Sequence, residues 1–199
     1  IRPVLQAMAE RGTPYKGVLY AGLMLTESGP KVLEFNCRLG DPETQVVIPL
    51  LASDPLELMM ACAQGNLNKA DVSWDNRNYV GVVMVSGGYP GKYQTGFEIS
   101  GLDEDGPKDT MVFHAGTKLD PMGTPLTAGG RVLTVVGGGD SIESARDLAY
   151  SRLELIGFQG AHWRRDISSS ANQLSLIHIS EPTRPRQRSY AVVWVQKKR

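Results

Sequence analysis

Cysteine is scarce in this chain, which holds only Cys37 and Cys62 among its 199 residues. Their spacing fits neither a disulfide framework nor a zinc site, which excludes the small folds that depend on such cross-links. Cys37 lies in a polar motif and Cys62 in an apolar helical pattern. We therefore predict that both thiols are reduced and that the protein is cytoplasmic.

Long apolar runs are also missing. No stretch approaches the roughly 18 consecutive apolar residues that a membrane-spanning helix needs. The first residues lack the pattern of a signal sequence and are typical of the middle of a longer protein. We accordingly expect no membrane partner.

The chain carries no net charge, because 21 basic and 21 acidic side chains balance. Six of the basic residues but only one acidic residue fall in 171–199, so residues 1–170 hold 15 basic and 20 acidic residues, a net charge of −5. The net negative charge of residues 1–170 does not favour binding to nucleic acid, and we expect no such partner. Arg184, Arg186 and Arg188 form an isolated basic run, which is weak support for one.

Apolar residues are plentiful enough for a core. They make up 41% of the chain, and the length allows one or two domains. Helical spacing, weak alternation, turn residues and Asp-Pro helix starts predict the elements of the first part. These are a helix over 4–11, strands over 17–26 and 31–37 joined by a turn at 28–30, and helices over 42–51 and 54–65. We predict that the apolar residues of the last helix, Leu56, Leu58, Met59, Met60 and Cys62, are core.

A polar stretch between Gly65 and Arg77 predicts a domain boundary. Beyond it, β-rich runs predict strands over 79–86, 111–117 and 131–136. A helix should follow, capped by Ser141, with Glu143 in its first turn and an apolar stripe that ends at Gly157. The predicted fold class is therefore mixed α/β, more specifically α+β, with strands and helices in separate runs.

The strand over 31–37 carries a candidate metal site. Side chains two residues apart on a strand point to the same face, so Glu34 and Asn36 converge. A carboxylate and an amide oxygen suit magnesium, which keeps waters and substrate phosphate oxygens in its shell. Arg38 would fall on the same side if the strand continued, where its planar fork could bind a phosphate or a carboxylate.

The residues that follow read as a turn and a helix start. Gly40 permits the bend, Asp41 is a plausible N-cap, and Pro42 suits the first helical position. Glu43 favours the first turn, and free backbone N–H groups there would face an anion. Each of these features by itself more often has no functional role. Glu-x-Asn on a strand is usually part of a solvent-exposed face, and Asp-Pro-Glu is usually only a favourable helix start.

Taken together, residues 34–45, Glu-Phe-Asn-Cys-Arg-Leu-Gly-Asp-Pro-Glu-Thr-Gln, resemble the metal-binding strand and following loop of the phosphoribosylamine–glycine ligases, ATP-grasp enzymes of purine synthesis. Leu39 departs from the family's usual Phe, an apolar exchange that should affect packing more than chemistry. Further blocks occur in the family's order. They begin at Tyr15-Lys-Gly-Val-Leu-Tyr-Ala-Gly-Leu-Met, Gly81-Val-Val-Met-Val-Ser-Gly-Gly-Tyr-Pro-Gly, Phe113-His-Ala-Gly-Thr and Gly129-Gly-Arg-Val-Leu, and the last spans residues 160–167.

The resemblance implies an activity and its participants. The parent enzyme would join glycine to 5-phosphoribosylamine with ATP, giving glycinamide ribonucleotide, ADP and phosphate. Its cofactors would be ATP and Mg²⁺ or Mn²⁺. Glu34 and Asn36 would hold the metal, Arg38 would act in catalysis, and Gly40, Asp41, Pro42, Glu43 and Thr44 would border the substrates.

The resemblance also implies a domain plan. Residues 1–74 would be the end of the ATP-grasp domain and 75–170 the family's small carboxy-terminal domain, a β-rich domain with a packed helix. The amino-terminal lobes of the same enzyme would precede residue 1, so we expect this chain to be inactive by itself. Two other interpretations stay open: another ATP-grasp ligase or carboxylase of nucleotide synthesis, and a folded but inactive binding or packing module.

We predict a different origin for residues 171–199. The stretch Leu174-Ser-Leu-Ile-His-Ile-Ser-Glu-Pro-Thr-Arg resembles the in-frame translation of a sequencing-library adapter, and an ordinary basic disordered tail is the alternative. We exclude these residues from the interpretation of the fold.

Glycine-rich loops at 86–92 and 137–140 match neither a Walker A loop nor a dinucleotide fingerprint. The second fits turn chemistry, and the first fits a turn or the edge of a substrate site equally well. The roles of His114 and Arg131 are likewise left open by the sequence. A structural role suits either residue, and Arg131 could instead anchor a sugar phosphate.

Overall fold

The structure is a computed structural model that describes residues 1–26 and 28–169. The chain divides into two compact units, which we describe separately. Unit 1 comprises Ile1–Thr44 and Leu51–Asp75, and unit 2 comprises Gln45–Leu50 with the chain from Asn76 onward. The tail at 171–199, for which we predicted an adapter origin, lies outside the described residues.

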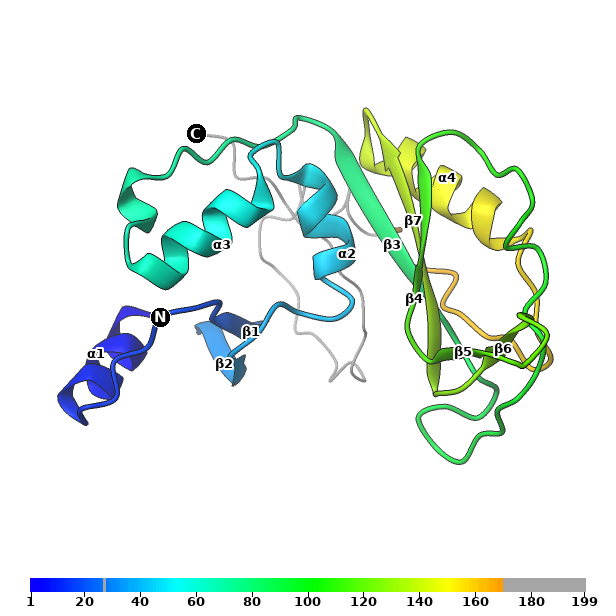
Figure 1. The fold of residues 1–199 in the computed structure, drawn as a ribbon, viewed down its shortest axis with the longest axis horizontal. Coiled ribbons are helices and arrows are strands. Elements are labelled where there is room, and N and C mark those ends of the chain that lie inside the picture. Colours follow the sequence, from blue (N-terminus) through cyan, green and yellow to red (C-terminus); the bar gives the residue numbers. More distant parts are fainter. Residues whose placement is uncertain (27, 170–199) are drawn as a thin grey trace. The chain divides into compact units, whose positions relative to one another are not determined.

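Unit 1 is built from a helix, a hairpin and a second helix (Figure 1). Its elements are α1 (Arg2–Glu10), β1 (Tyr20–Thr26), β2 (Gly29–Asn36), α3 (Pro55–Gln64) and the 3-10 turn η2 (Leu67–Lys69). Strands β1 and β2 pair antiparallel, with Tyr20 opposite Asn36 and Thr26 opposite Gly29. The predicted hairpin is thus confirmed, although Gly29 and Pro30 belong to strand β2 and not to the turn.

Helix α3 begins and ends where the sequence predicts. The Asp54 side chain accepts a hydrogen bond from the Leu56 N–H at 2.8 Å, and Pro55 takes the first helical position. Gly65 ends the helix in the left-handed conformation, at φ 77°, which glycine adopts without a steric penalty.

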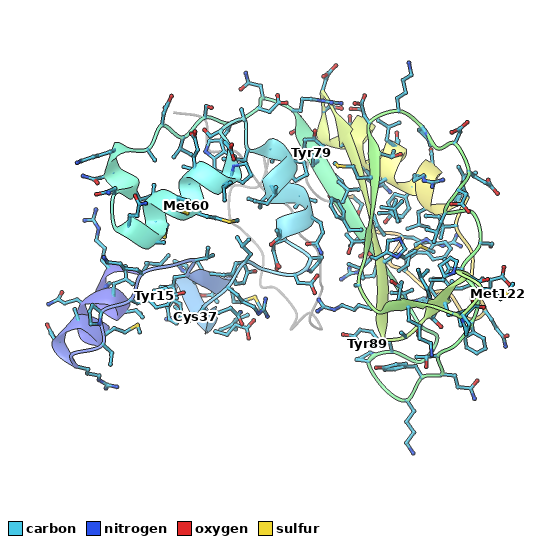
Figure 2. The ribbon with its side chains drawn as sticks, in the orientation of Figure 1. Tyr15, Cys37, Met60, Tyr79, Tyr89 and Met122 are labelled. Carbon is cyan, nitrogen blue, oxygen red and sulfur yellow. The ribbon has the colours of Figure 1, made fainter. Side chains whose placement is uncertain are left out.

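The prediction that the apolar residues of α3 form a core is wrong. Leu56 is 66% exposed, Met59 50% and Met60 51%, and Figure 2 labels Met60 on this helix. Helical spacing of apolar residues identifies a face that favours burial, but the described part of unit 1 supplies no packed layer against it.

The predicted helix over 42–51 is confirmed in part, as a shorter helical segment over 44–50. Residues 41–43 form a turn with a cis Asp41–Pro42 peptide bond, and α2 (Thr44–Val47) continues directly into the 3-10 turn η1 (Ile48–Leu50). Asp41 is therefore no N-cap of a helix that starts at Pro42. Pro49 has no N–H to donate to a carbonyl four residues earlier, which favours a 3-10 turn over a longer α-helix.

Unit 2 is a sheet covered by a helix (Figure 1). The sheet has the order β3-β7-β4 with antiparallel pairing, and a separate hairpin joins β5 to β6. The elements are β3 (Asn78–Val85), β4 (Thr110–His114), β5 (Thr117–Leu119), β6 (Pro125–Thr127), β7 (Arg131–Gly139) and α4 (Ile142–Leu153). The three predicted strands are confirmed with small shifts of their ends, and β5 and β6 were not predicted.

Helix α4 starts as predicted and ends earlier. Ser141 caps it through a bond from the Ser144 N–H at 3.1 Å, and the Ser144 side chain accepts from the Ser141 N–H in return. The helix ends at Leu153 and not at Gly157.

The core lies between α4 and the sheet. The fifteen buried hydrophobic residues of the described chain all belong to unit 2. They are Val46, Leu50, Val80, Val82, Met84, Ile99, Val132, Leu133, Val135, Val136, Ala145, Ala149, Leu153, Ile156 and Ile167. Unit 2 therefore has the hydrophobic core of a stable domain, and the described part of unit 1 does not. Across the residues that the structure describes, no helix is long and apolar enough to cross a membrane.

Candidate functional site

Glu34 and Asn36 meet on one side of β2, as the strand period predicts. The Asn36 side-chain Nδ2 donates to Glu34 Oε1 at 3.2 Å. Because the amide nitrogen is the donor, the amide oxygen of Asn36 is available as a ligand beside the carboxylate. The strand therefore presents two oxygen ligands to the same region.

Strand β1 makes room for this pair. Gly22 lies opposite Glu34, and a Cβ atom at Gly22 would come within 3.1 Å of Glu34 Cγ. The Glu34 side chain thus lies over the backbone of Gly22, where a larger residue would push it aside. Gly22 was not identified from the sequence, although a glycine inside an otherwise apolar strand indicates a close approach.

The loop at 40–44 is folded tightly after β2. Thr44 donates to the Gly40 carbonyl oxygen from its backbone N–H at 3.1 Å and from Oγ1 at 2.5 Å. Gly40 and Pro42 are buried, and the Glu43 side chain folds back over Gly40. A Cβ atom at Gly40 would lie 2.8 Å from Glu43 Cδ, so this arrangement requires glycine.

Tyr20 connects this loop to the strand pair. Its hydroxyl donates to Glu43 Oε1 at 2.9 Å, and Tyr20 itself lies opposite Asn36 in the register. Burial raises the pKa of Tyr20 to about 12, with the hydrogen bond to Glu43 and the charges of Glu43 and Glu34 acting in the same direction. The phenol therefore stays protonated and donating throughout the neutral range.

Arg38 is not placed by the strand as we expected. β2 ends at Asn36, residues 37 and 38 form a bend, and Arg38 Nη1 donates to the Leu39 carbonyl oxygen at 2.9 Å. The expectation of free backbone N–H groups at a helix start is wrong as well. The helix begins at Thr44, whose N–H is bonded to Gly40, and α2 has only four residues.

The donor set fits a magnesium ion. Within residues 1–26 and 28–169, no group of three or more His, Cys, Asp and Glu side chains is arranged to hold a metal. Glu34 and Asn36 supply one carboxylate and one amide oxygen, which leaves the remaining positions of an octahedral shell to water and to substrate phosphate oxygens.

Cys37 lies beside the site and contacts Tyr15, as Figure 2 shows. Burial raises the pKa of the Tyr15 hydroxyl, and a hydrogen bond with Cys37 adds to the effect. The Tyr15 hydroxyl also donates to the Val18 carbonyl oxygen at 2.7 Å. Both cysteines are free thiols in the structure.

In unit 2, the glycine-rich loops pack backbone against backbone. A Cβ atom at Gly87 would lie 2.8 Å from the Gly160 carbonyl oxygen, and one at Gly116 would lie 2.7 Å from Gly129 Cα. Gly130 lies under the ring of Tyr89. Close packing therefore explains why these positions are glycine, and no bound ligand is needed for that explanation. His114 Nδ1 is 3.0 Å from Thr117 Oγ1, a local contact between neighbouring strands.

The family models divide the chain in the same order. Residues 1–44 match the phosphoribosylglycinamide synthetase ATP-grasp (A) domain, and residues 79–170 match the phosphoribosylglycinamide synthetase C domain. A phosphoribosylamine–glycine ligase from Caldanaerobacter subterraneus is 49% identical over 169 residues, which cover 85% of this chain and 40% of that protein.

Two solved structures are similar. A phosphoribosylamine–glycine ligase from Thermotoga maritima matches with a TM-score of 0.64 and 35% identity, over 81% of this chain and 39% of that one. The biotin carboxylase domain of 2-oxoglutarate carboxylase from Hydrogenobacter thermophilus, solved with MgADP and bicarbonate, matches with a TM-score of 0.53 and 18% identity, over 80% of this chain and 35% of that one. The second likeness concerns the fold alone.

The hairpin of unit 1 and the sheet–helix unit 2 thus form the end of an ATP-grasp domain followed by a C domain of the synthetase type. The chain belongs to the phosphoribosylamine–glycine ligase family of purine biosynthesis, and it corresponds to the carboxy-terminal part of those proteins. It spans about two fifths of the length of the relatives that it matches.

Proposed function

We propose that the full-length protein containing this chain ligates glycine to 5-phosphoribosylamine at the expense of ATP. The observation that carries the proposal is that the Glu34 and Asn36 side chains converge on one face of β2. The chain that contains them is 49% identical, over 169 residues, to a phosphoribosylamine–glycine ligase. The domain boundaries at 74 and 170 and the cytoplasmic location also stay predictions.

The reaction would pass through an acyl phosphate. The glycine carboxylate attacks the γ-phosphorus of ATP, and ADP leaves with the bridging oxygen and its electron pair. The amine of phosphoribosylamine then attacks the glycyl carbonyl carbon, inorganic phosphate leaves, and the amine gives up a proton. No enzyme nucleophile is required, since catalysis of this kind rests on positioning and electrostatics.

Glu34 and Asn36 would hold Mg²⁺ or Mn²⁺, which neutralises charge on the phosphates when bound. Arg38 would stabilise the transferring phosphoryl group, because a guanidinium matches phosphate oxygens in charge and geometry. Gly40, Asp41, Pro42, Glu43 and Thr44 would border the substrates. The tight fold of this loop over Gly40 supports a fixed binding edge.

One rival is another ATP-grasp enzyme, such as a carboxylase, whose fold this chain shares. The match of residues 79–170 to the synthetase C domain supports the ligase instead. The other rival is a folded binding module without turnover, and we propose that state for the 199-residue chain by itself, because it spans only two fifths of its relatives.

The test is glycine-dependent ADP release by the full-length gene product, with phosphoribosylamine as the acceptor. We expect release only when both substrates are present, and a loss of about 100-fold in Glu34→Gln, because the carboxylate that would hold the metal ion is removed. Glu10→Gln, an exposed carboxylate on α1, is the matched control. Unchanged magnesium-dependent turnover in Glu34→Gln would contradict the assignment of the metal site.

A further inference from the structure

We propose that Tyr20 is a positioning residue that holds Glu43 beside the Glu34 and Asn36 face, where Glu43 accepts the ammonium group of the amino acid substrate. The inference rests on the proposed ligase activity and assigns a role that the motif itself does not contain. Tyr20 lies on β1, outside residues 34–45.

Glu43 is held from two sides. On one side its carboxyl group folds over Gly40, where any side chain would collide with it. On the other side Tyr20 donates to Oε1 at 2.9 Å. A half-buried glutamate with both contacts loses most of its rotamer freedom before a ligand arrives, which is how a binding group is preorganised.

The hydrogen bond from Tyr20 also ties Glu43 to β1, the strand that pairs with the Glu34 and Asn36 strand. Tyr20 lies opposite Asn36, and the charges of both Glu43 and Glu34 act on its hydroxyl. The Tyr20 hydroxyl donates to Oε1 of Glu43, which leaves Oε2, the oxygen that lies over Gly40, to accept from another donor.

The chemistry of the substrate favours a second carboxylate in the site. A free amino acid presents an ammonium group two bonds from the carboxylate that must approach the ATP phosphates. Glu34 is committed to the metal in this scheme, so a second carboxylate at short range is the natural counter-charge for the ammonium. We assign this role to Glu43, which Tyr20 holds through Oε1 at 2.9 Å.

Steady-state kinetics of the full-length gene product test the proposal. Tyr20→Phe removes the hydroxyl and keeps the ring. We expect it to raise KM for glycine by about 10-fold, the cost of one hydrogen bond to a charged group, with little change in KM for ATP. Glu43→Gln should raise KM for glycine further. The double variant should match Glu43→Gln, because the tyrosine acts only through the glutamate.

Tyr15→Phe is the matched control. Tyr15 lies in the same unit and its hydroxyl bonds to a backbone carbonyl oxygen, so its loss should leave KM for glycine unchanged. A thermal unfolding midpoint within 2 °C of the wild type would mark Tyr20→Phe as folded; if the midpoint falls further, Tyr20→His, which keeps a ring donor, should restore part of the affinity for glycine.

The outcomes separate the two proposals. An active wild type whose Tyr20→Phe variant has an unchanged KM for glycine, or equal losses for glycine and ATP, overturns the role of Tyr20 and leaves the ligase standing. A wild type without glycine-dependent ADP release overturns both. A selective rise in KM for glycine that is absent in Glu43→Gln backgrounds supports the positioning role.

Discussion

Strand β7 and helix α4 approach each other closely at Gly137. A Cβ atom there would collide with the Ala145 carbonyl oxygen and the Ala149 backbone nitrogen, and would lie 3.1 Å from Ala149 Cα. Backbone atoms of a packed helix cannot move aside cheaply. The glycine run at 137–139, which fits turn chemistry in the sequence, is in fact the end of a strand under a helix.

We expect Gly137→Ala to lower the free energy of unfolding of unit 2 by about 3 kcal/mol, through overpacking. Urea unfolding followed by circular dichroism and by the fluorescence of Trp163, which packs against the core, measures the change. Gly157→Ala is the control, because its Cβ meets only the Ser100 hydroxyl at 3.3 Å. Equal stability of the two variants would show that the helix can shift away from β7.

A second residue-scale prediction concerns pH. The hydrogen bond from Arg77 to Asp109, at 3.0 Å, holds the pKa of Asp109 below its usual value. A carboxyl group with a lowered folded-state pKa contributes stability above its unfolded pKa, and this is lost as the pH falls through the folded value. Unit 2 should thus lose this small contribution below about pH 4, the ordinary range of an aspartate.

The variant that isolates this effect is Asp109→Asn. Asparagine tolerates the left-handed backbone at this position, where φ is 63°. The variant's free energy of unfolding should fall less between pH 5 and pH 2 than that of the wild type. Asp103→Asn, at an exposed position in the same unit, serves as the control. Parallel pH profiles for the wild type and Asp109→Asn would rule out a contribution from the ion pair.

At the scale of elements, helix α4 depends both on hydrogen bonds between residues close in sequence and on contacts between residues far apart in sequence. Its start is set by the reciprocal bonds of Ser141 and Ser144, which are local in sequence. Its last turn includes Arg152, which is only 6% exposed because Nη2 donates to the Leu102 carbonyl oxygen at 2.9 Å. The helical stripe predicts burial of Ala145, Ala149 and Leu153, but not of an arginine.

Removing the helix cap tests how much these local hydrogen bonds contribute to stability. Ser141→Ala should lower the free energy of unfolding of unit 2 by about 1 kcal/mol, since the Ser144 N–H at the helix start loses its side-chain acceptor. Ser151→Ala is the control, because that serine lies exposed within the same helix and alanine favours helix there. Thermal or urea unfolding of both variants gives the comparison. A loss as large in Ser151→Ala would assign the effect to the helix surface and not to the cap.

At the scale of the whole molecule, the two units differ in their cores. Unit 1 exposes large apolar side chains on its hairpin and on α3, among them Leu23, Val32, Leu33, Leu56 and Met60. A two-stranded hairpin is marginally stable in water without a layer packed on it. The described part of unit 1 is therefore expected to be less stable by itself than unit 2.

Amide hydrogen exchange of the 199-residue chain measures this difference. We expect amides of β3, β7 and α4 to exchange at least about 100-fold more slowly than amides of β1 and β2, because opening unit 2 exposes a hydrophobic core. Peptides from both units in one sample act as internal controls for each other. Equal protection in the two hairpin strands and in β7 would contradict the prediction.

Much of the fold follows from the sequence by local rules. The hairpin, the caps at Asp54 and Ser141, the strands of unit 2 and the pairing of Glu34 with Asn36 all depend on residues a few positions apart. The Asp41-Pro42-Glu43 helix start failed because the same residues serve a turn equally well, and the continuation of β2 to Arg38 failed because a strand's end depends on its partner strand.

The sequence by itself determined the family, the two oxygen ligands on one strand face and the order of most elements, because motif spacing and side-chain periodicity are properties of neighbouring residues. Only the tertiary structure decided that Tyr20 holds Glu43 and that Gly22 makes room for Glu34. It also decided that α3 exposes its apolar face. These facts depend on contacts between residues far apart along the chain, whose meeting is fixed by strand register and packing and not by any local pattern.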